Sequence, residues 1–130
     1  MRARVSKKSQ LGLFSGAVEN LKVRPHPVDL DDEALAAELP TRLYLGTSSW
    51  NFTGWRGILY ERDTAVKDLS RHGLRAYAAR HWLRCVGVDR GYYNPVPSED
   101  WELYRAQVPA HFKFMIKALQ RALMPWIDER

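Results

Sequence analysis

Side chains that could bind or transform a ligand follow three short apolar runs of the 130-residue sequence. They are Thr47, Ser48, Trp50 and Trp55 after the first run, Asp89, Arg90, Tyr92 and Tyr93 after the second, and Lys117 at the end of the third. Together they offer hydroxyls, aromatic rings, a carboxylate and two cations. Such a set is typical of a pocket for an anionic or polyhydroxylated small molecule, which is the ligand class we expect.

Lys117 and Asp89 are the two candidates for a catalytic role. A lysine that ends a strand can bind an anion, form a Schiff base, or act as a base when it is desolvated, although a solvated lysine is the simpler reading. Asp89 could act as a base, and Arg90 beside it could bind an anion. The two could equally pair with each other, or with Lys117, as structure. Because side chains alternate across a strand, only one of these neighbours should point inward, and we favour Asp89.

The remaining pocket candidates also have structural readings. Trp50, Trp55, Tyr92 and Tyr93 could stack on a sugar or a base, but packing of loops at the rim of the fold explains them equally well. Thr47 and Ser48 could donate hydrogen bonds to a ligand. No G-x-S-x-G elbow accompanies them, so the sequence does not indicate a serine nucleophile.

The sequence contains no pattern that indicates a metal site, a disulfide, a reactive thiol or a membrane span. The four histidines, His26, His72, His81 and His111, fall in no metal-ligand spacing, so neither a metal nor another cofactor is expected. Cys85 is the single cysteine, which excludes an internal disulfide, and we expect it to be an inert thiol in a buried strand. No stretch approaches the roughly 20 apolar residues of a membrane span, so we expect a cytoplasmic protein without a membrane partner.

The charge of the chain is unevenly distributed. The formal net charge is +5, and the whole excess lies in residues 41–130, because the basic and acidic groups of residues 1–40 cancel. A basic surface attracts anions, and interleaved tryptophan, tyrosine and arginine could contact a nucleic acid, which is the alternative function. The arginines are dispersed and no known nucleic-acid motif is present, so we expect any such binding to be weak and unspecific.

The elements that would position these residues alternate along the chain. A strand is predicted within R-L-Y-L-G-T-S-S-W at 42–50, two short helices around Gly73, a second strand at 84–90, a helix at 98–109 capped by Ser98, and a third strand at 111–118 before a helix-like tail. This alternation predicts an α/β fold with about three parallel strands and crossover helices. In such folds the site lies at the carboxyl ends of the strands, where the candidate side chains are found.

Two segments precede the α/β region. Residues 1–28 lack periodicity and end in R-P-H-P, which predicts a flexible leader. Residues 29–40 predict one short helix with acidic residues in its first turn and Pro40 at its end, and Leu35 and Leu39 are spaced to dock one face of that helix. The third region is residues 41–130.

Five segments resemble a known family in their order and content. They are G-T-S-S-W-x-F-x-G-W-R-G-x-x-Y, L-x-x-Y-A, V-G-V-D-R-x-Y-Y, P-x-P-S and V-P-x-x-F-x-F-x-x-K-A. Over about residues 43–118 the chain resembles the YecE-like family, domain of unknown function 72. The resemblance implies a TIM-type (β/α)₈ barrel and leaves the activity open, because that of the family is not established.

The chain departs from the family pattern in two ways. Many members have a glutamate where this sequence has Gly87, so Asp89 would have to substitute with a shorter reach. A barrel also needs roughly 250 residues, whereas this chain supplies about three strands. We therefore expect a truncated amino-terminal part of the barrel, inactive alone. Its unpaired strands and uncovered inner sheet face would favour self-association.

Overall fold

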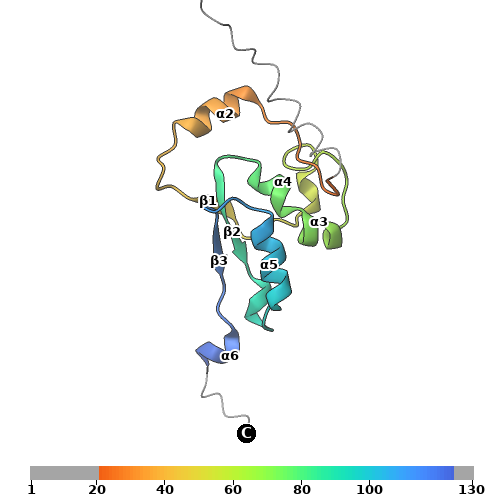
Figure 1. Cartoon of the computed structure of the whole chain (residues 1–130), viewed down its shortest axis with the longest axis vertical. Coiled ribbons are helices and arrows are strands. Elements are labelled where there is room, and N and C mark those ends of the chain that lie inside the picture. The colour runs from red at the N-terminus through yellow and green to blue at the C-terminus, as the bar shows by residue number, and fades with distance from the viewer. Residues whose placement is uncertain (1–20, 125–130) are drawn as a thin grey trace, which may run out of the picture.

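Three parallel strands form the centre of the protein in a computed structural model that describes residues 21–124. The strands are β1 (Leu45–Thr47), β2 (Leu83–Val88) and β3 (Lys113–Ile116), in the order β1-β2-β3 (Figure 1). The register sets Thr47 beside Val86 and Val86 beside Phe114. The predicted α/β class with about three parallel strands is confirmed. The arrangement is that of part of a (β/α)₈ barrel.

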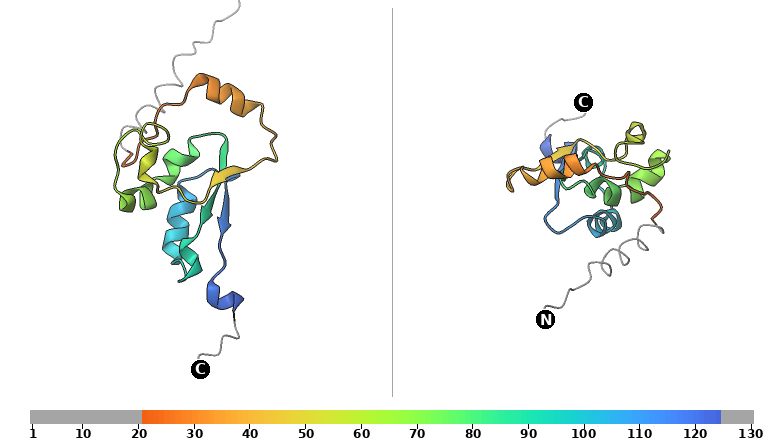
Figure 2. Two further views of the ribbon diagram at one scale, coloured as in Figure 1. Left: turned by 180° about the vertical axis from the view of Figure 1, so that it is seen from behind. Right: turned by 90° about the horizontal axis from the view of Figure 1, so that it is seen from above.

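Three α-helices lie in the connections between the strands and pack together beside the sheet, and each connection also holds a short 3-10 helix, Thr53–Trp55 in the first and Arg90–Tyr92 in the second (Figures 1 and 2). The α-helices are α3 (Val66–His72), α4 (Leu74–Ala78) and α5 (Ser98–Ala106). The break between α3 and α4 falls at Gly73, as predicted, and a Cβ there would lie only 2.5 Å from the Leu69 carbonyl oxygen. The predicted cap of α5 is wrong by one residue, because Pro97 occupies the N-cap position and Ser98 is already helical.

The hydrophobic core lies between the sheet and these helices. Val86 and Val88 of β2 are buried, as are Leu74 and Tyr77 of α4 and Tyr104 of α5. Residues two apart on a strand share a face, so the odd-numbered positions of β2 face the other way. The core is therefore one-sided, and α4 and α5 supply its outer layer.

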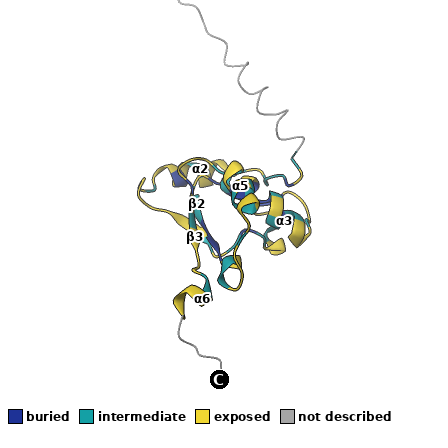
Figure 3. Ribbon diagram, turned by 60° about the horizontal axis from the view of Figure 1, so that its bottom comes forward, coloured by how far each residue is buried: buried dark blue, intermediate teal, exposed yellow. Residues whose placement is uncertain are grey.

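The opposite face of the sheet is open to solvent, as the exposed β3 shows in Figure 3. Met115 is 69% exposed and Tyr44 is 40% exposed. Cys85, expected to be buried, is only half-buried, with its Sγ 3.3 Å from the Tyr44 carbonyl oxygen. The expected burial was wrong because helices cover only one face of β2. The partial burial of Cys85 nevertheless raises the pKa of its thiol.

A helix before the sheet is also present but shorter than predicted. Helix α2 spans Leu30–Ala37, and the Asp29 side chain accepts a 2.9 Å hydrogen bond from the Asp31 amide. Of the described side chains in this helix, Ala36 is buried whereas Leu35 is 65% exposed. The predicted leucine face therefore does not dock.

The predicted flexible leader needs correction for residues 21–28. Val23 is 2% exposed, and the His26 amide donates a 2.9 Å hydrogen bond to the Leu59 carbonyl oxygen. The Glu61 amide donates to the Arg24 carbonyl oxygen at 3.0 Å. The two prolines prevent a regular element but allow this extended pairing, which ties the segment to the loop after β1. Residues 1–20 of the predicted leader, and residues 125–130 of the predicted tail helix, lie outside the described chain. Within it, the tail forms α6 (Gln120–Leu123).

Two buried tyrosines make the stability of the fold sensitive to high pH. Burial raises the pKa of both Tyr60 and Tyr77, and the Tyr60 hydroxyl donates to the Trp50 carbonyl oxygen. Their contribution to stability is fully present below the ordinary tyrosine pKa of about 10 and declines above it, as the unfolded chain ionises first. Urea unfolding at pH 8 and pH 11 should therefore give a lower free energy of unfolding at pH 11. In the double variant Tyr60→Phe/Tyr77→Phe, the free energy of unfolding should decrease less between pH 8 and pH 11. An equal decrease in the variant and the parent chain would show that ionisation of these two tyrosines does not cause the loss of stability.

Candidate functional site

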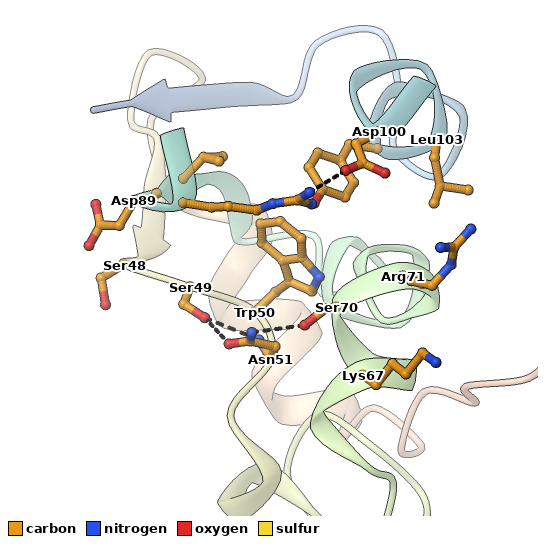
Figure 4. A pocket seen from close by; sticks show the side chains of 14 residues that line it. Ser48, Ser49, Trp50, Asn51, Lys67, Ser70, Arg71, Asp89, Asp100 and Leu103 are labelled. Atoms are coloured by element: carbon orange, nitrogen blue, oxygen red, sulfur yellow. Dashed lines mark hydrogen bonds and ion pairs between the residues drawn. The ribbon is translucent and has the colours of Figure 1, made fainter. Parts of the chain in front are cut away.

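A cavity of about 550 Å³ opens where β1 and β2 end, between the strand ends and helices α3 and α5 (Figure 4). It is lined by residues from four segments: Ser48, Ser49, Trp50 and Asn51; Lys67, Ser70 and Arg71; Gly87, Val88, Asp89 and Arg90; and Asp100, Leu103 and Tyr104. Four of the sequence-predicted residues, Ser48, Trp50, Asp89 and Arg90, are among them. The cavity is thus at the edge of the sheet where parallel α/β folds place their sites.

Asp89 and Arg90 have different surroundings although they are adjacent in sequence. The Arg90 guanidinium lies 2.5 Å from the Asp100 carboxylate and donates a 2.9 Å hydrogen bond to the Tyr104 hydroxyl, and these contacts raise its pKa. Arg90 therefore pairs with Asp100 of α5, and not with Asp89, the structural pairing that the sequence had left open. The exposed Asp89 carboxylate has no hydrogen bond or ion pair within the described residues, and it lies near Ser48 (Figure 4).

Trp50 forms a wall of the cavity from within the core. Its side chain is 6% exposed, and its Nε1 donates a 3.0 Å hydrogen bond to the Leu69 carbonyl oxygen. Its ring meets Tyr104 edge to face at 4.9 Å between centroids. These contacts give Trp50 a packing role, whereas the predicted stacking of Trp50 on a ligand stays a prediction.

The sequence did not identify the polar residues that α3 contributes. Lys67 and Arg71 lie four apart on this helix and project at the side of the cavity away from Asp89 (Figure 4). Between them, Ser70 accepts a 2.9 Å hydrogen bond from the Asn51 side-chain amide, which also pairs with the Ser49 hydroxyl. Because Lys67 and Arg71 are four residues apart in a predicted helix, the sequence indicated that they share one face of it. It did not indicate that this face is turned toward the cavity.

Lys117 lies beside the cavity residues without lining the cavity. Its amide donates a 3.2 Å hydrogen bond to the Val88 carbonyl oxygen, which brings the end of β3 next to the end of β2. The Lys117 Nζ is 4.9 Å from the centroid of the Tyr92 ring, a cation–π contact, and Tyr92 meets Tyr93 edge to face at 4.8 Å. The three residues form a separate group at the same end of the sheet. Their roles in catalysis or ligand stacking stay predictions.

Thr47 and Trp55 support the end of β1. The Thr47 amide donates a 2.9 Å hydrogen bond to the Tyr77 hydroxyl, and the Thr47 hydroxyl donates to the Ser49 carbonyl oxygen at 2.6 Å. Trp55 packs between Phe52 and Tyr77. Both residues also line a neighbouring hollow of about 430 Å³ with Ser48. In the part of the chain that the structure describes, no three His, Cys, Asp or Glu side chains gather to hold a metal.

Gly87 leaves no space for a larger side chain. A Cβ at this position would lie 2.7 Å from the Ser48 carbonyl oxygen and 3.0 Å from the Ser48 Cα. The glutamate that the family resemblance implies for this position would require the backbone after β1 to move. Asp89 is therefore the carboxylate that the end of β2 supplies in this protein.

Comparison with known proteins identifies the family of this chain and nothing more specific. No curated protein and no solved structure matches the chain. Among residues 21–124, no helix is sufficiently long and apolar to cross a membrane. A family model described as protein of unknown function DUF72 matches residues 44–122, which is more than half of the 130 residues. This range contains all three strands and confirms the resemblance seen in the sequence motifs. The chain therefore belongs to the DUF72 family of proteins of unknown function.

Proposed function

We propose that the 550 Å³ cavity binds a small polyhydroxylated molecule that carries an anionic group, such as a sugar acid or a sugar phosphate. The observation that carries this proposal is the position of the charges that lie outside the Arg90–Asp100 ion pair. The Asp89 carboxylate and the Ser48 hydroxyl lie on one side, and the cations Lys67 and Arg71 lie on the other (Figure 4).

Each side of the cavity suits a different part of such a ligand. Carboxylate, hydroxyl and amide groups exchange hydrogen bonds with sugar hydroxyls, which accounts for Ser48, Asn51 and Asp89. Arg71 can bind a carboxylate or phosphate through two parallel N–H donors, and Lys67 adds a second positive charge. Arg90 is a weaker candidate for this task because Asp100 and Tyr104 already hold its guanidinium.

Asp89 and Lys117 are the residues from which a reaction at this site would be built. They follow neighbouring strands, and the Lys117 amide bonds to the residue before Asp89. A carboxylate without a partner can accept a proton, and a lysine near an aromatic ring can hold an anion or attack a carbonyl. The proposed function is ligand binding, with these two groups at its edge.

A titration with matched ligands tests the proposal. Gluconate and glucose 6-phosphate should bind, and glucose should bind more weakly because it lacks the anionic group. Lys67→Ala/Arg71→Ala should weaken binding of the anionic ligands by roughly 10-fold or more, since charge-assisted hydrogen bonds contribute about 1.5–3 kcal/mol. Asp89→Asn should lower the affinity for all three ligands. Calorimetry or amide chemical shifts would measure the affinities.

Matched controls separate this site from general electrostatics. Arg62→Ala and Glu102→Gln remove exposed charges that do not line the cavity, so they should leave the affinities unchanged. Equal affinity of the Lys67→Ala/Arg71→Ala variant and the parent chain would refute the proposal. Sub-micromolar binding of single-stranded DNA that persists at physiological salt would instead favour the nucleic-acid alternative.

A further inference from the structure

A second cavity, of about 250 Å³, lies at the opposite end of the sheet, where β2 begins. It is lined by Ala78, Arg80, His81, Leu83, Arg84, Pro109 and His111. All of its ionisable side chains are of basic type, and no carboxylate is among them. This composition differs from the first cavity, whose lining includes Asp89 and Asp100.

Arg80 is the buried charge at this cavity. Its side chain is 4% exposed, and its Nη2 donates to the Ile58 carbonyl oxygen. Its Nη1 is buried and has no hydrogen-bond partner among the described residues. Asp32 and Glu33 of α2 act on Arg80 only through space, and Glu33 instead lies 3.6 Å from His81. Arg80 therefore has no contacting counter-charge in the described chain.

The Arg80 guanidinium also lies 5.8 Å from the centre of the Trp82 ring, a cation–π contact that brings no negative charge. A buried cation without a contacting counter-charge destabilises a fold, and arginine does not escape this cost by losing its proton. A negative ion in the adjoining cavity would offset that cost as a counter-charge. We propose that the second cavity binds a small oxyanion of the phosphate type.

Arg84 and His111 would supply the direct contacts at the mouth of the cavity. Arg84 donates through Nε to the His81 carbonyl oxygen and through Nη1 to the carbonyl oxygens of Pro40 and Thr41. Its Nη2 has no hydrogen bond within the described residues, so it is available to an anion. His111 is exposed beside it and can donate a ring N–H.

The test measures whether phosphate stabilises the full chain more than chloride does at equal ionic strength. At a phosphate concentration ten times its dissociation constant, the Tm should rise by roughly 4–8 °C. Amide chemical shifts should move near residues 80–84 and 111 when phosphate is added. Sulfate, which has a similar shape, should act in the same direction.

Single substitutions in the second cavity test whether phosphate acts through that cavity. In the Lys67→Ala/Arg71→Ala background, which removes the cations proposed to bind phosphate in the first cavity, the Tm difference between phosphate and chloride should fall to less than half in Arg84→Ala and in His111→Ala, and it should vanish in Arg80→Met. It should persist in Arg62→Ala, which removes an exposed arginine elsewhere, and in the Lys67→Ala/Arg71→Ala variant of the first cavity. If Arg80→Met does not fold, the other two variants decide the result. An unchanged difference in Arg84→Ala and His111→Ala, or its loss in Lys67→Ala/Arg71→Ala, would overturn the proposal.

Discussion

Replacing Gly46 with alanine is expected to lower the free energy of unfolding by roughly 3 kcal/mol, the upper part of the range for overpacked sites. A Cβ at this position would lie 2.0 Å from the Cys85 carbonyl oxygen and 2.7 Å from the Cys85 Sγ. Gly46 and Cys85 are partners in the β1–β2 ladder, next to an irregularity in its register. The obstructing atoms include the main chain of the middle strand, so the added methyl group can be accommodated only if β1 separates from β2.

Urea unfolding of Gly46→Ala and Gly91→Ala would measure this effect against a matched control. At Gly91 an added Cβ would have its nearest neighbour, the Val96 side chain, at 3.5 Å, which is ordinary contact distance. Gly91→Ala should therefore change the free energy of unfolding by less than 1 kcal/mol, as surface substitutions usually do. Similar values for the two variants would show that the close approach of the strands is not needed for folding.

Replacing Tyr77 with alanine is expected to cost roughly 3–5 kcal/mol, as for other large buried aromatic side chains. Tyr77 is fully buried, and its ring packs edge to face with Phe112. Its hydroxyl accepts a hydrogen bond from the Thr47 amide at 2.9 Å and lies 3.0 Å from both the Thr47 hydroxyl and the Cys85 carbonyl oxygen. The substitution thus removes core volume and the polar link between α4 and two strands.

Tyr77→Phe separates the two contributions. This variant keeps the ring and loses the hydroxyl, so it should cost about 1–3 kcal/mol through the groups left without partners. Chemical denaturation of both variants, with Tyr93→Ala as an exposed control, gives the comparison. If Tyr77→Phe proved as stable as the parent chain, the hydroxyl would have no part in holding β1 to β2.

The succession of elements could be predicted from the sequence because their hydrophobic periods are clear. The buried valines of β2 and the Tyr104 face of α5 lie where those periods indicate. The bounds could not be predicted as well, and β1 occupies only three residues, Leu45–Thr47, of the segment 42–50 within which a strand was predicted. Strand ends are set by pairing with neighbours, which the local sequence does not encode. The open sheet face agrees with the reasoning behind the expected self-association, and the self-association itself stays a prediction.

The position of the candidate site could be predicted from the sequence, but the full set of residues that line it could not. Parallel strands put Ser48 and Asp89 at one end of the sheet, and this follows from topology alone. The pairing of Arg90 with Asp100 depends on where α5 packs, and the contribution of Lys67 depends on the rotation of α3. Both are tertiary facts that no local pattern contains.

The hydroxyl of Tyr77 also implies an order of assembly. It joins the Cys85 carbonyl oxygen, eight residues away in sequence, and the Thr47 amide, thirty residues away. Closing a longer loop costs more chain entropy, so contacts between near neighbours tend to form first. Helix α4 and β2 would therefore form the early unit of folding, with the ring of Tyr77 already in place. Strand β1 would then add last, to a hydroxyl and a strand edge that are already positioned to receive it.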